Sequence, residues 1–220
     1  MGFVVITGAN RGIGLALCQL YRRRGKSVIA ACRQSSPELE QTGADVVSGV
    51  EITTADGREH LRSELGDRRI DLLIHNAGVW CDDWLGELNE AQLQEAIQVN
   101  ALAPLLLTEA LLPHLDAGSK IGLITSRMGS IADNSSGGRY GYRMAKAALN
   151  AAGKSLSIDL RQNGIAVAIL HPGFVKTRMV GFSGNITPAE SARGLSQRLE
   201  ELSLDSSGTF WHADGTPLPW

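Results

Sequence analysis

A tyrosine and a lysine with helical spacing are the two side chains in this sequence with the clearest use in proton transfer. Tyr142 and Lys146 lie four positions apart at the start of an Ala-rich segment. On a helix, residues with this spacing share a face, with their Cβ atoms about 5–6 Å apart. A neighbouring ammonium favours the phenolate and lowers the pKa of tyrosine, which is ordinarily about 10. The pair therefore predicts a general acid or base.

Two serines upstream are candidates to assist the tyrosine. Ser126 directly follows an apolar run, whereas Ser130 is nearer to Tyr142 in the sequence. We favour Ser126, because it lies at the end of a predicted strand and the length of a connecting loop varies easily. Tyr140 is set aside, since Met144 and not a lysine follows it by four residues. A Tyr–Lys pair also arises by chance, so its interpretation depends on the elements around it.

The rest of the chain predicts the elements that position these residues. Seven short runs are apolar, as buried parallel strands are: residues 3–6, 27–32, 44–48, 70–75, 121–125, 165–170 and 208–211. Helical patterns lie between most of them, at 12–24, 54–65, 89–115, 142–160 and 188–202, with an irregularity expected at Pro104. This alternation predicts an α/β fold: one Rossmann-type, doubly wound parallel sheet of about seven strands, with helices on both faces. Such sheets bind ligands outside the carboxyl ends of their strands.

The composition indicates a globular protein with a small molecular partner. The 220 residues are 43% hydrophobic and 20% charged, which suits a single domain spanning residues 1–220. The net charge of −2 offers no basic surface for nucleic acid or for a membrane. Cys18, Cys32 and Cys81 follow no disulfide or metal-binding pattern, so we expect reduced cysteines and no metal site.

No targeting or membrane-spanning segment is predicted. The N-terminal residues lack the cationic stretch and the long apolar region of a signal peptide. The most apolar run, residues 101–112, contains Pro104 and Glu109 and is shorter than a bilayer requires, so it predicts a core helix. We expect a cytoplasmic chain that starts at Met1.

The loop after the first strand has the glycines of a phosphate site. Three glycines between a strand and a helix N-terminus let backbone amides approach a pyrophosphate, although their GxxxGxG spacing differs from GxGxxG. The expected cofactor contacts from this loop are Gly8, Asn10, Arg11, Gly12, Ile13 and Gly14. The second strand ends at Arg33 without an acidic residue, and with Arg11 this favours NADP(H) over NAD(H).

The fourth strand ends in small residues. Asn76, Ala77 and Gly78 let the chain pass close to an adenine ribose, and the amide of Asn76 is placed to tie neighbouring strands together. His75 precedes them inside an apolar strand, where a core histidine is a better interpretation than a catalytic one.

These motifs together resemble the short-chain dehydrogenase/reductase family. The order and approximate spacing of Thr7-Gly8-xxx-Gly12-x-Gly14, Asn76-Ala77-Gly78, Asn100, Ser126, Tyr142-xxx-Lys146 and His171-Pro172-Gly173 are similar to the family pattern over nearly the whole chain. The closing segment 208–220 further resembles the branch of C-factor-like and sniffer-type carbonyl reductases.

The resemblance implies a role for each residue of the central motif. Tyr142 would give a proton to a carbonyl oxygen while nicotinamide delivers hydride, and Ser126 would hydrogen-bond the same oxygen. Lys146 would hold the nicotinamide ribose and depress the pKa of the tyrosine. Asn100 would lie at a helix irregularity and support a water relay to Lys146.

Further residues are implied around the cofactor and the substrate. Glu51 stands near the adenine, where the family usually has Asp, and Pro172, Gly173, Val175 and Thr177 would shape the nicotinamide site. An apolar wall for a small carbonyl substrate is expected from Trp80, Trp84, Met179 and Phe182, beside a short lid at 178–188. Asp82, Asp83 and Glu87 are expected to be solvated surface charges.

The sequence leaves three functions open. The first is an NADP(H)-dependent reductase of aldehydes and ketones, for which the full Asn100, Ser126, Tyr142 and Lys146 set argues. The second is an NADP(H)-binding redox sensor or signalling protein with little turnover. A sugar-nucleotide epimerase or dehydratase is disfavoured, because 220 residues leave little room for its substrate region. We also expect a homodimer, formed through the helix that carries Ala147, Ala148, Ala151 and Ala152.

Overall fold

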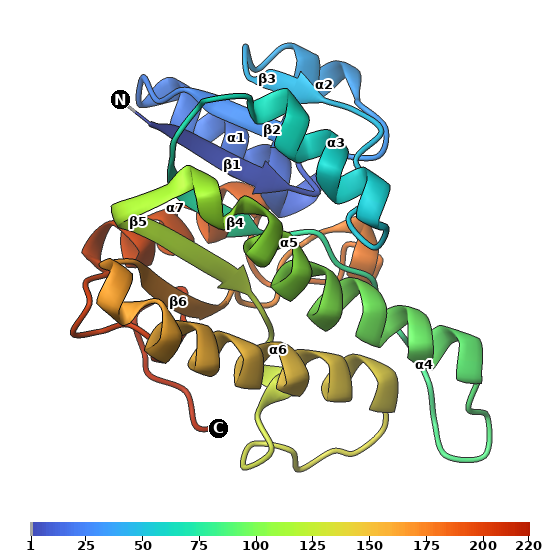
Figure 1. The fold of residues 1–220 in the computed structure, drawn as a ribbon. Helices are drawn as coiled ribbons and strands as arrows, with labels where there is room; N and C mark the ends of the chain where they lie inside the picture. The colour runs from blue at the N-terminus through green and yellow to red at the C-terminus, as the bar shows by residue number, and fades with distance from the viewer. Residues whose placement is uncertain (1) are drawn as a thin grey trace.

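A parallel sheet of seven strands forms the centre of the molecule (Figure 1). The computed structural model describes residues 2–220. Its strands are β1 (Phe3–Thr7), β2 (Val28–Ala31), β3 (Asp45–Val47), β4 (Ile70–His75), β5 (Leu115–Ile124), β6 (Ala166–His171) and β7 (Phe210–His212). They follow the order β3-β2-β1-β4-β5-β6-β7, and every neighbouring pair is parallel. The predicted doubly wound sheet is confirmed.

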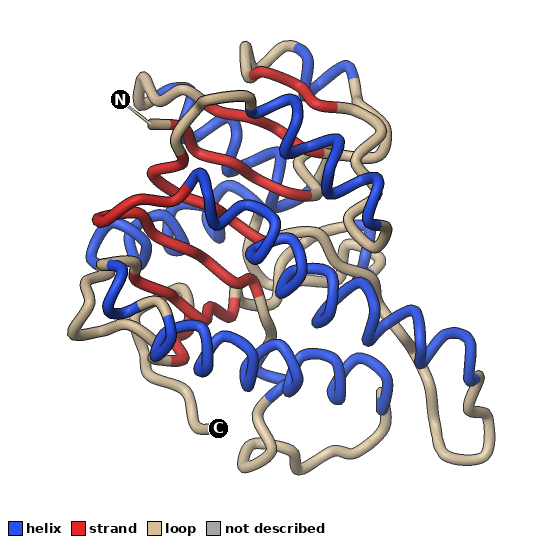
Figure 2. The backbone as a smooth tube through the Cα atoms, viewed as in Figure 1, coloured by secondary structure: helices blue, strands red, loops and turns tan. Residues whose placement is uncertain are grey.

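Helices cover both faces of this sheet, as Figure 2 shows. They are α1 (Gly12–Arg23), α2 (Pro37–Glu40), α3 (Ala55–Leu65), α4 (Glu90–Ile97), α5 (Ala103–Leu111), α6 (Tyr140–Asp159) and α7 (Pro188–Glu201). On one face, Leu61, Leu107 and Leu149 bring α3, α5 and α6 into one buried cluster with the strands. On the other face, Leu17 of α1 and Leu195 of α7 do the same. Apolar strand residues therefore meet a helix on either side.

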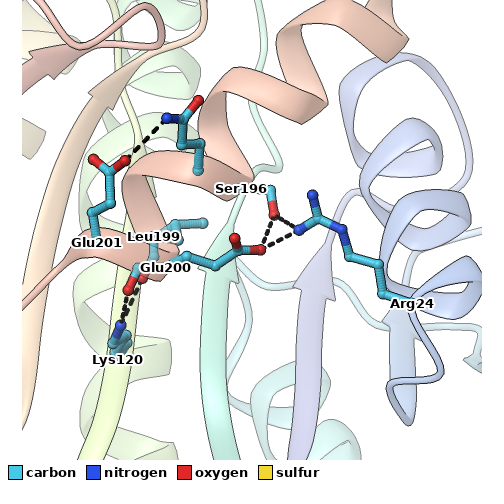
Figure 3. Close-up of polar contacts among 7 residues, drawn as sticks. Arg24, Lys120, Ser196, Leu199, Glu200 and Glu201 are labelled. Carbon is cyan, nitrogen blue, oxygen red and sulfur yellow. Dashed lines mark hydrogen bonds and ion pairs between the residues drawn. The ribbon is translucent and has the colours of Figure 1, made fainter.

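Polar contacts fix α7 to its neighbours (Figure 3). The ammonium of Lys120 donates to the carbonyl oxygens of Leu199 and Glu200, both at 2.8 Å. These are among the last carbonyls of α7, which have no partner within the helix. Arg24, at the end of α1, pairs with the carboxylate of Glu200 and donates to Ser196 Oγ at 2.6 Å. The end of α7 is therefore tied to both α1 and β5.

The long helix predicted over residues 89–115 is divided. A π-helical turn, Gln98–Leu102, separates α4 from α5. Pro104 follows it and has no N–H to donate to the carbonyl of Asn100, four residues earlier. The irregularity expected from Pro104 is thus confirmed, and it lies just before the proline. The helix also ends earlier than predicted: a 3-10 turn, Leu112–His114, leads directly into β5, which begins at Leu115 and not at residue 121.

The helical run Glu90–His114 is long and apolar enough to cross a membrane by length and composition. Within the described chain, however, its inner side is core. Ala103, Leu107 and Leu111 have no exposed area and contact the sheet cluster. This is the behaviour of a buried helix in a layered α/β fold.

Candidate active site

The carboxyl ends of β5 and β6 border a cavity of about 340 Å³. Ser126, which follows β5, and Tyr142, on the first turn of α6, both line it. Four residues predicted for the nicotinamide site, Pro172, Gly173, Val175 and Thr177, line it as well, together with Ile13 of the glycine loop. The topology therefore brings the proposed catalytic residues and the end of the phosphate loop to one cavity.

Tyr142 is buried at the wall of this cavity, with 8% of its surface exposed. The ring of Trp80 lies against it, with 4.7 Å between the ring centroids. Burial raises the pKa of Tyr142 to about 12, although a hydrogen bond with Ser126 acts to lower it. The expectation of a depressed tyrosine pKa is therefore wrong for this structure. The phenol therefore keeps its proton at neutral pH and is available as a proton donor.

Lys146 does not offset the effect of this burial on the pKa of Tyr142. Its side chain is 4% exposed, and its ammonium donates to the carbonyl of Ile124 at 2.9 Å. Its Nζ is 5.7 Å from the centroid of the Tyr142 ring, so the helical spacing does place the two together. Burial lowers the pKa of Lys146 to about 7, because the charged form is desolvated. A lysine that is only partly charged at neutral pH gives the tyrosine little electrostatic help.

Ser126 and Ser130 have different partners. Ser126 begins a 3-10 turn, Arg127–Gly129, and its hydroxyl accepts from Met128 N at 3.1 Å while remaining in reach of Tyr142. Ser130 is also buried, but its hydroxyl accepts from Asp133 N at 3.1 Å, and it does not line the cavity. The structure therefore brings Ser126, and not Ser130, to the tyrosine.

Asn100 lies in the π-helical turn, and its side-chain amide hydrogen-bonds the main chain of Val79. Its Oδ1 accepts from Val79 N at 2.9 Å, and its Nδ2 donates to Val79 O at 3.0 Å. A Cβ on Gly78 would be 2.8 Å from that Oδ1 and 3.8 Å from the Nζ of Lys146, so a larger residue here would displace the amide of Asn100. The amide thus fixes the chain that follows β4 beside Lys146. The water relay remains a prediction.

The glycine loop has the shape that a dinucleotide phosphate requires. Gly8 and Gly12 have φ angles of +63° and +56°, and a Cβ on Gly14 would be 2.3 Å from the carbonyl oxygen of Gly8. At the start of α1, Arg11 provides no side-chain cap, and the first turn contains no acidic residue. Its N–H groups are therefore free of side-chain partners, and the helix dipole favours an anion there.

Asn76 ties β4 to β1 as expected. Its Nδ2 donates to the carbonyl oxygens of Thr7 and Gly8, both at 3.0 Å. The hydroxyl of Thr7 accepts in return from Asn76 N at 3.0 Å and from Ala77 N at 3.1 Å. This network lies at the point where the strand order reverses, and it holds the entrance of the glycine loop in place.

Arg33, which follows β2, and Glu51, which follows β3, face each other. Arg33 Nη1 is 3.4 Å from Glu51 Oε2, and 68% of the arginine side chain is exposed. The carboxylate also accepts from Thr53 N at 3.2 Å and from Thr53 Oγ1 at 2.8 Å. Burial acts to raise the pKa of Glu51, but these hydrogen bonds and the charge of Arg33 outweigh it and hold the pKa below its usual value. The buried hydroxyl of Ser35 nearby has no partner. An exposed cation and a spare hydroxyl fit a ribose phosphate.

Comparison with known proteins decides the family. The family model for short chain dehydrogenases matches residues 2–185. The chain belongs to the short-chain dehydrogenase family. This short-chain dehydrogenase is 38% identical to the 1-hydroxy-2-glutathionyl-2-methyl-3-butene dehydrogenase of a Rhodococcus species, with 100% of both chains covered. It is 44% identical to the C-signal protein of Myxococcus xanthus over 69% of this chain and 93% of that protein.

This short-chain dehydrogenase is similar in structure to carbonyl reductases. The Sniffer carbonyl reductase of Drosophila melanogaster has a TM-score of 0.92 and 30% identity, with 100% of both chains covered. An NADPH-bound carbonyl reductase from chicken fatty liver has a TM-score of 0.88 and 31% identity, with 99% of this chain and 98% of that chain covered. The predicted resemblance to the C-factor-like and sniffer-type branch is confirmed.

The predicted substrate wall is only partly present in this dehydrogenase. Trp80 and Met179 line the cavity, and Phe174 and Val180 join them. Phe182 is outside the lining, because its left-handed backbone (φ +62°) after Gly181 leaves 65% of the residue exposed. The indole of Trp84 is also outside the lining, and the guanidinium of Arg139 lies 4.2 Å from its ring centroid.

The predicted exposure of Asp83 is wrong. Asp82 and Glu87 are exposed, as expected, but Asp83 is 3% exposed and accepts a hydrogen bond from Gly141 N at 3.1 Å. No periodicity marks Asp83, because it lies in an irregular stretch, and its partner is 58 residues away. Within residues 2–220, no group of three or more His, Cys, Asp or Glu side chains is arranged to hold a metal ion.

His75 is confirmed as a core histidine. It is 2% exposed, its Nε2 is 2.8 Å from Thr108 Oγ1, and burial lowers its pKa to about 3. The unfolded chain binds a proton at His75 below its ordinary pKa of about 6.5, while the folded chain does not until about pH 3, so acid favours unfolding.

The His75→Gln variant keeps a hydrogen-bonding side chain at this position and cannot titrate. Between pH 7.5 and 5, His75 should cost wild type about 2 kcal/mol of unfolding free energy, a loss that the variant avoids. Urea denaturation of both proteins at the two pH values measures this. Equal pH slopes would show that His75 is not buried in its neutral form.

Proposed function

We propose that this protein is an NADP(H)-dependent carbonyl reductase that interconverts aldehydes or ketones and alcohols. The observation that carries the proposal is the shared cavity. It brings the buried phenol of Tyr142, the hydroxyl of Ser126 and Ile13, beside the glycine loop, to one cavity. Bound NADPH would supply the hydride, and the chain would supply the proton and the geometry.

The proton is the part of the reaction that the residues perform. Tyr142 holds its proton at neutral pH, so it can donate it to a carbonyl oxygen as negative charge develops there. Ser126, which lines the same cavity, would stabilise the same oxygen. In the direction of alcohol oxidation, the deprotonated form of Tyr142 would accept the proton of the alcohol, and Ser126 would hydrogen-bond the same oxygen.

Lys146 and Asn100 would support the donor. The buried ammonium has one donor committed to the carbonyl of Ile124, which leaves N–H groups to hold the hydroxyls of a nicotinamide ribose. The carbonyl of Asn100 receives no N–H from Pro104, so it is a natural acceptor for a water molecule on the way to Lys146.

We further propose that the cofactor is NADP(H) rather than NAD(H). Arg33 is exposed at the end of β2, and Arg11 is exposed in the glycine loop. An arginine in the first of these places accommodates a 2′-phosphate, and β2 itself ends without the acidic residue that would bind the ribose hydroxyls of NAD.

The Arg33→Ala variant tests this preference. Loss of a charged phosphate contact should weaken NADPH binding about 10- to 100-fold and leave NADH binding within about twofold. Fluorescence titration with each cofactor gives the two dissociation constants. Arg23→Ala, which removes an exposed arginine of α1, is the matched control. Unchanged NADPH affinity in Arg33→Ala would overturn the assignment.

The substrates that the cavity favours are small and apolar around their carbonyl group. Trp80, Met179 and Phe174 line it, and the lid that follows β6 occupies only about residues 178–188. A short lid leaves the cavity open to compounds of different shape, so we expect a broad range of aldehydes, ketones and quinones.

The alternative is a protein that binds NADP(H) to sense or signal with little turnover. The similarity to a protein named C-signal is the observation that keeps it as the second candidate. Purified protein mixed with NADPH and a panel of carbonyl compounds separates the two. The reductase predicts NADPH oxidation well above that of a Tyr142→Phe control, whereas a sensor predicts binding with equal, negligible turnover in both.

We propose that the chain works as one domain, residues 1–220, in a cytoplasmic homodimer. One face of α6 presents Met144, Ala148, Ala151 and Ile158, all exposed and uncharged. Met144 and Ile158 lie at the ends of this face, and the small residues Ala148 and Ala151 lie between them. Two antiparallel α6 helices can therefore approach closely at Ala151, with Met144 of one protomer against Ile158 of its partner. Light scattering that finds only monomers at micromolar concentration would rule this out.

A further inference from the structure

The segment Trp80 to Trp84 encloses the first turn of α6, the turn that carries Tyr142. Trp80 lies against the tyrosine ring at 4.7 Å, and the thiol of Cys81 is so close to Gly141 that a Cβ there would be 2.9 Å from the sulfur. At the other end, the ring of Trp84 contacts Gly138 and Arg139. Residues 80–84, which follow β4, thus pack against the N-terminal turn of α6, about 60 residues later in the sequence.

The centre of this contact is the buried carboxylate of Asp83. Its Oδ2 accepts from Gly141 N at 3.1 Å, and its main-chain carbonyl accepts from Arg139 N at 2.7 Å. With 3% of the residue exposed, this is a buried polar group, and burial of such a group is costly unless it is hydrogen-bonded. Its Oδ2 lies at the N-terminal end of a long helix, which carries the positive end of the helix dipole.

Helix α6 needs this outside partner. Its N-cap residue, Arg139, has a left-handed backbone (φ +51°) and makes no side-chain cap, and no acidic residue lies in the first turn. The orphan N–H of Gly141 would otherwise be buried without an acceptor. Asp83 therefore performs the capping that the local sequence of α6 lacks, one residue before Tyr142.

We propose that Asp83 is a positioning residue that fixes the first turn of α6 and, through it, the hydroxyl of Tyr142 in the cavity. The effect on turnover rests on the proposed reductase function. The effect on the helix does not. Asp83 is not expected to touch substrate or cofactor, and it does not line the cavity.

The experiment compares three substitutions. Asp83→Ala removes the acceptor, Asp83→Asn keeps an oxygen in the same place, and Asp83→Glu keeps the charge but moves it outward by one methylene group. Asn89→Ala is the control. Asn89 is the exposed N-cap residue of α4, and its side-chain oxygen also accepts from a helix N–H, that of Gln92, at 3.1 Å.

Three readouts are measured on each full-length protein. For carbonyl reduction, Asp83→Ala and Asp83→Glu should lower kcat by about 10- to 100-fold, since a small displacement of a catalytic group has effects of that size. The dissociation constant for NADPH should stay within about threefold, and Asp83→Asn and Asn89→Ala should retain kcat within about threefold. Hydrogen exchange at the amides of residues 140–146 should accelerate in Asp83→Ala and Asp83→Glu only.

The outcomes separate the proposal from its alternatives. Equal kcat in Asp83→Ala and wild type, or equal exchange at residues 140–146, would overturn it. A loss of kcat in Asp83→Asn as large as in Asp83→Ala would also overturn it, because the acceptor oxygen would then not be what matters. If Asp83→Ala does not fold, Asp83→Glu against Asp83→Asn makes the same comparison. If wild type shows no turnover, the reductase function fails, while the exchange measurement still decides the role of Asp83.

Discussion

Replacement of Tyr142 by Phe is expected to reduce kcat for carbonyl reduction by about 10²- to 10⁴-fold, the usual contribution of a positioned general acid. The substitution removes only the hydroxyl that Ser126 contacts and leaves the ring against Trp80. The phenol lies in a buried site, so no bulk water takes over as donor with equal efficiency. Steady-state rates with NADPH and an aldehyde substrate measure the loss.

A neighbouring tyrosine supplies the control for this prediction. Tyr140 lies on the first turn of the same helix, but it is 37% exposed and does not line the cavity. Tyr140→Phe should therefore retain kcat within about twofold, and both variants should bind NADPH like wild type. A similar kcat for Tyr142→Phe and Tyr140→Phe would mean that the proton comes from elsewhere.

Lys146→Met is expected to separate activity from stability. The substitution removes the N–H groups of the Lys146 side chain, which we propose hold the ribose, so kcat/KM should fall at least about 100-fold. The free energy of unfolding of the variant should be equal to or higher than that of wild type. The folded pKa of Lys146, about 7, is below the unfolded value of about 10.5, so the unfolded chain binds the proton more tightly. This penalty is fully present below pH 7 and disappears as the pH rises toward 10.5.

The gain in unfolding free energy expected for Lys146→Met is therefore largest at pH 7 and below. The penalty is on the order of a few kcal/mol, and the loss of the hydrogen bond to the carbonyl of Ile124 offsets about 1–3 kcal/mol of it. Urea denaturation at pH 7 and pH 10 should show Lys146→Met at least as stable as wild type at pH 7, with the difference shrinking at pH 10. Lys154→Met, which removes an exposed lysine of the same helix, should change neither quantity. A variant that is much less stable than wild type at pH 7 would contradict a buried, weakly basic lysine.

The sheet was predictable because its strands are short and buried on both faces. Runs such as Val4 to Ile6 and Val167 to Leu170 are apolar without alternation, since helices cover either side. The edges of elements were less predictable. Helix α2 (Pro37–Glu40) has only four residues and depends on Ser36, whose hydroxyl accepts from Leu39 N, so no periodicity announces it.

In the site, spacing predicted position but not protonation. The four-residue offset of Tyr142 and Lys146 and the strand-end position of Ser126 were enough to place these residues together. Their pKa values depend on how completely the surrounding elements exclude water, and no local pattern encodes that. The same holds for Asp83: a carboxylate next to tryptophans in an irregular stretch resembles a surface residue until the fold brings Gly141 to it.

The transfer of a labelled hydride tests the central claim most directly. Wild-type protein is incubated with NADPH that carries deuterium at the reactive C4 position and with an aldehyde or ketone, and the product is analysed by mass spectrometry. A reductase predicts one deuterium on the carbinol carbon of the alcohol, formed by wild type and nearly absent with Tyr142→Phe. Tight NADPH binding without any labelled alcohol across a broad panel of carbonyl compounds would contradict the reductase function and favour a sensor.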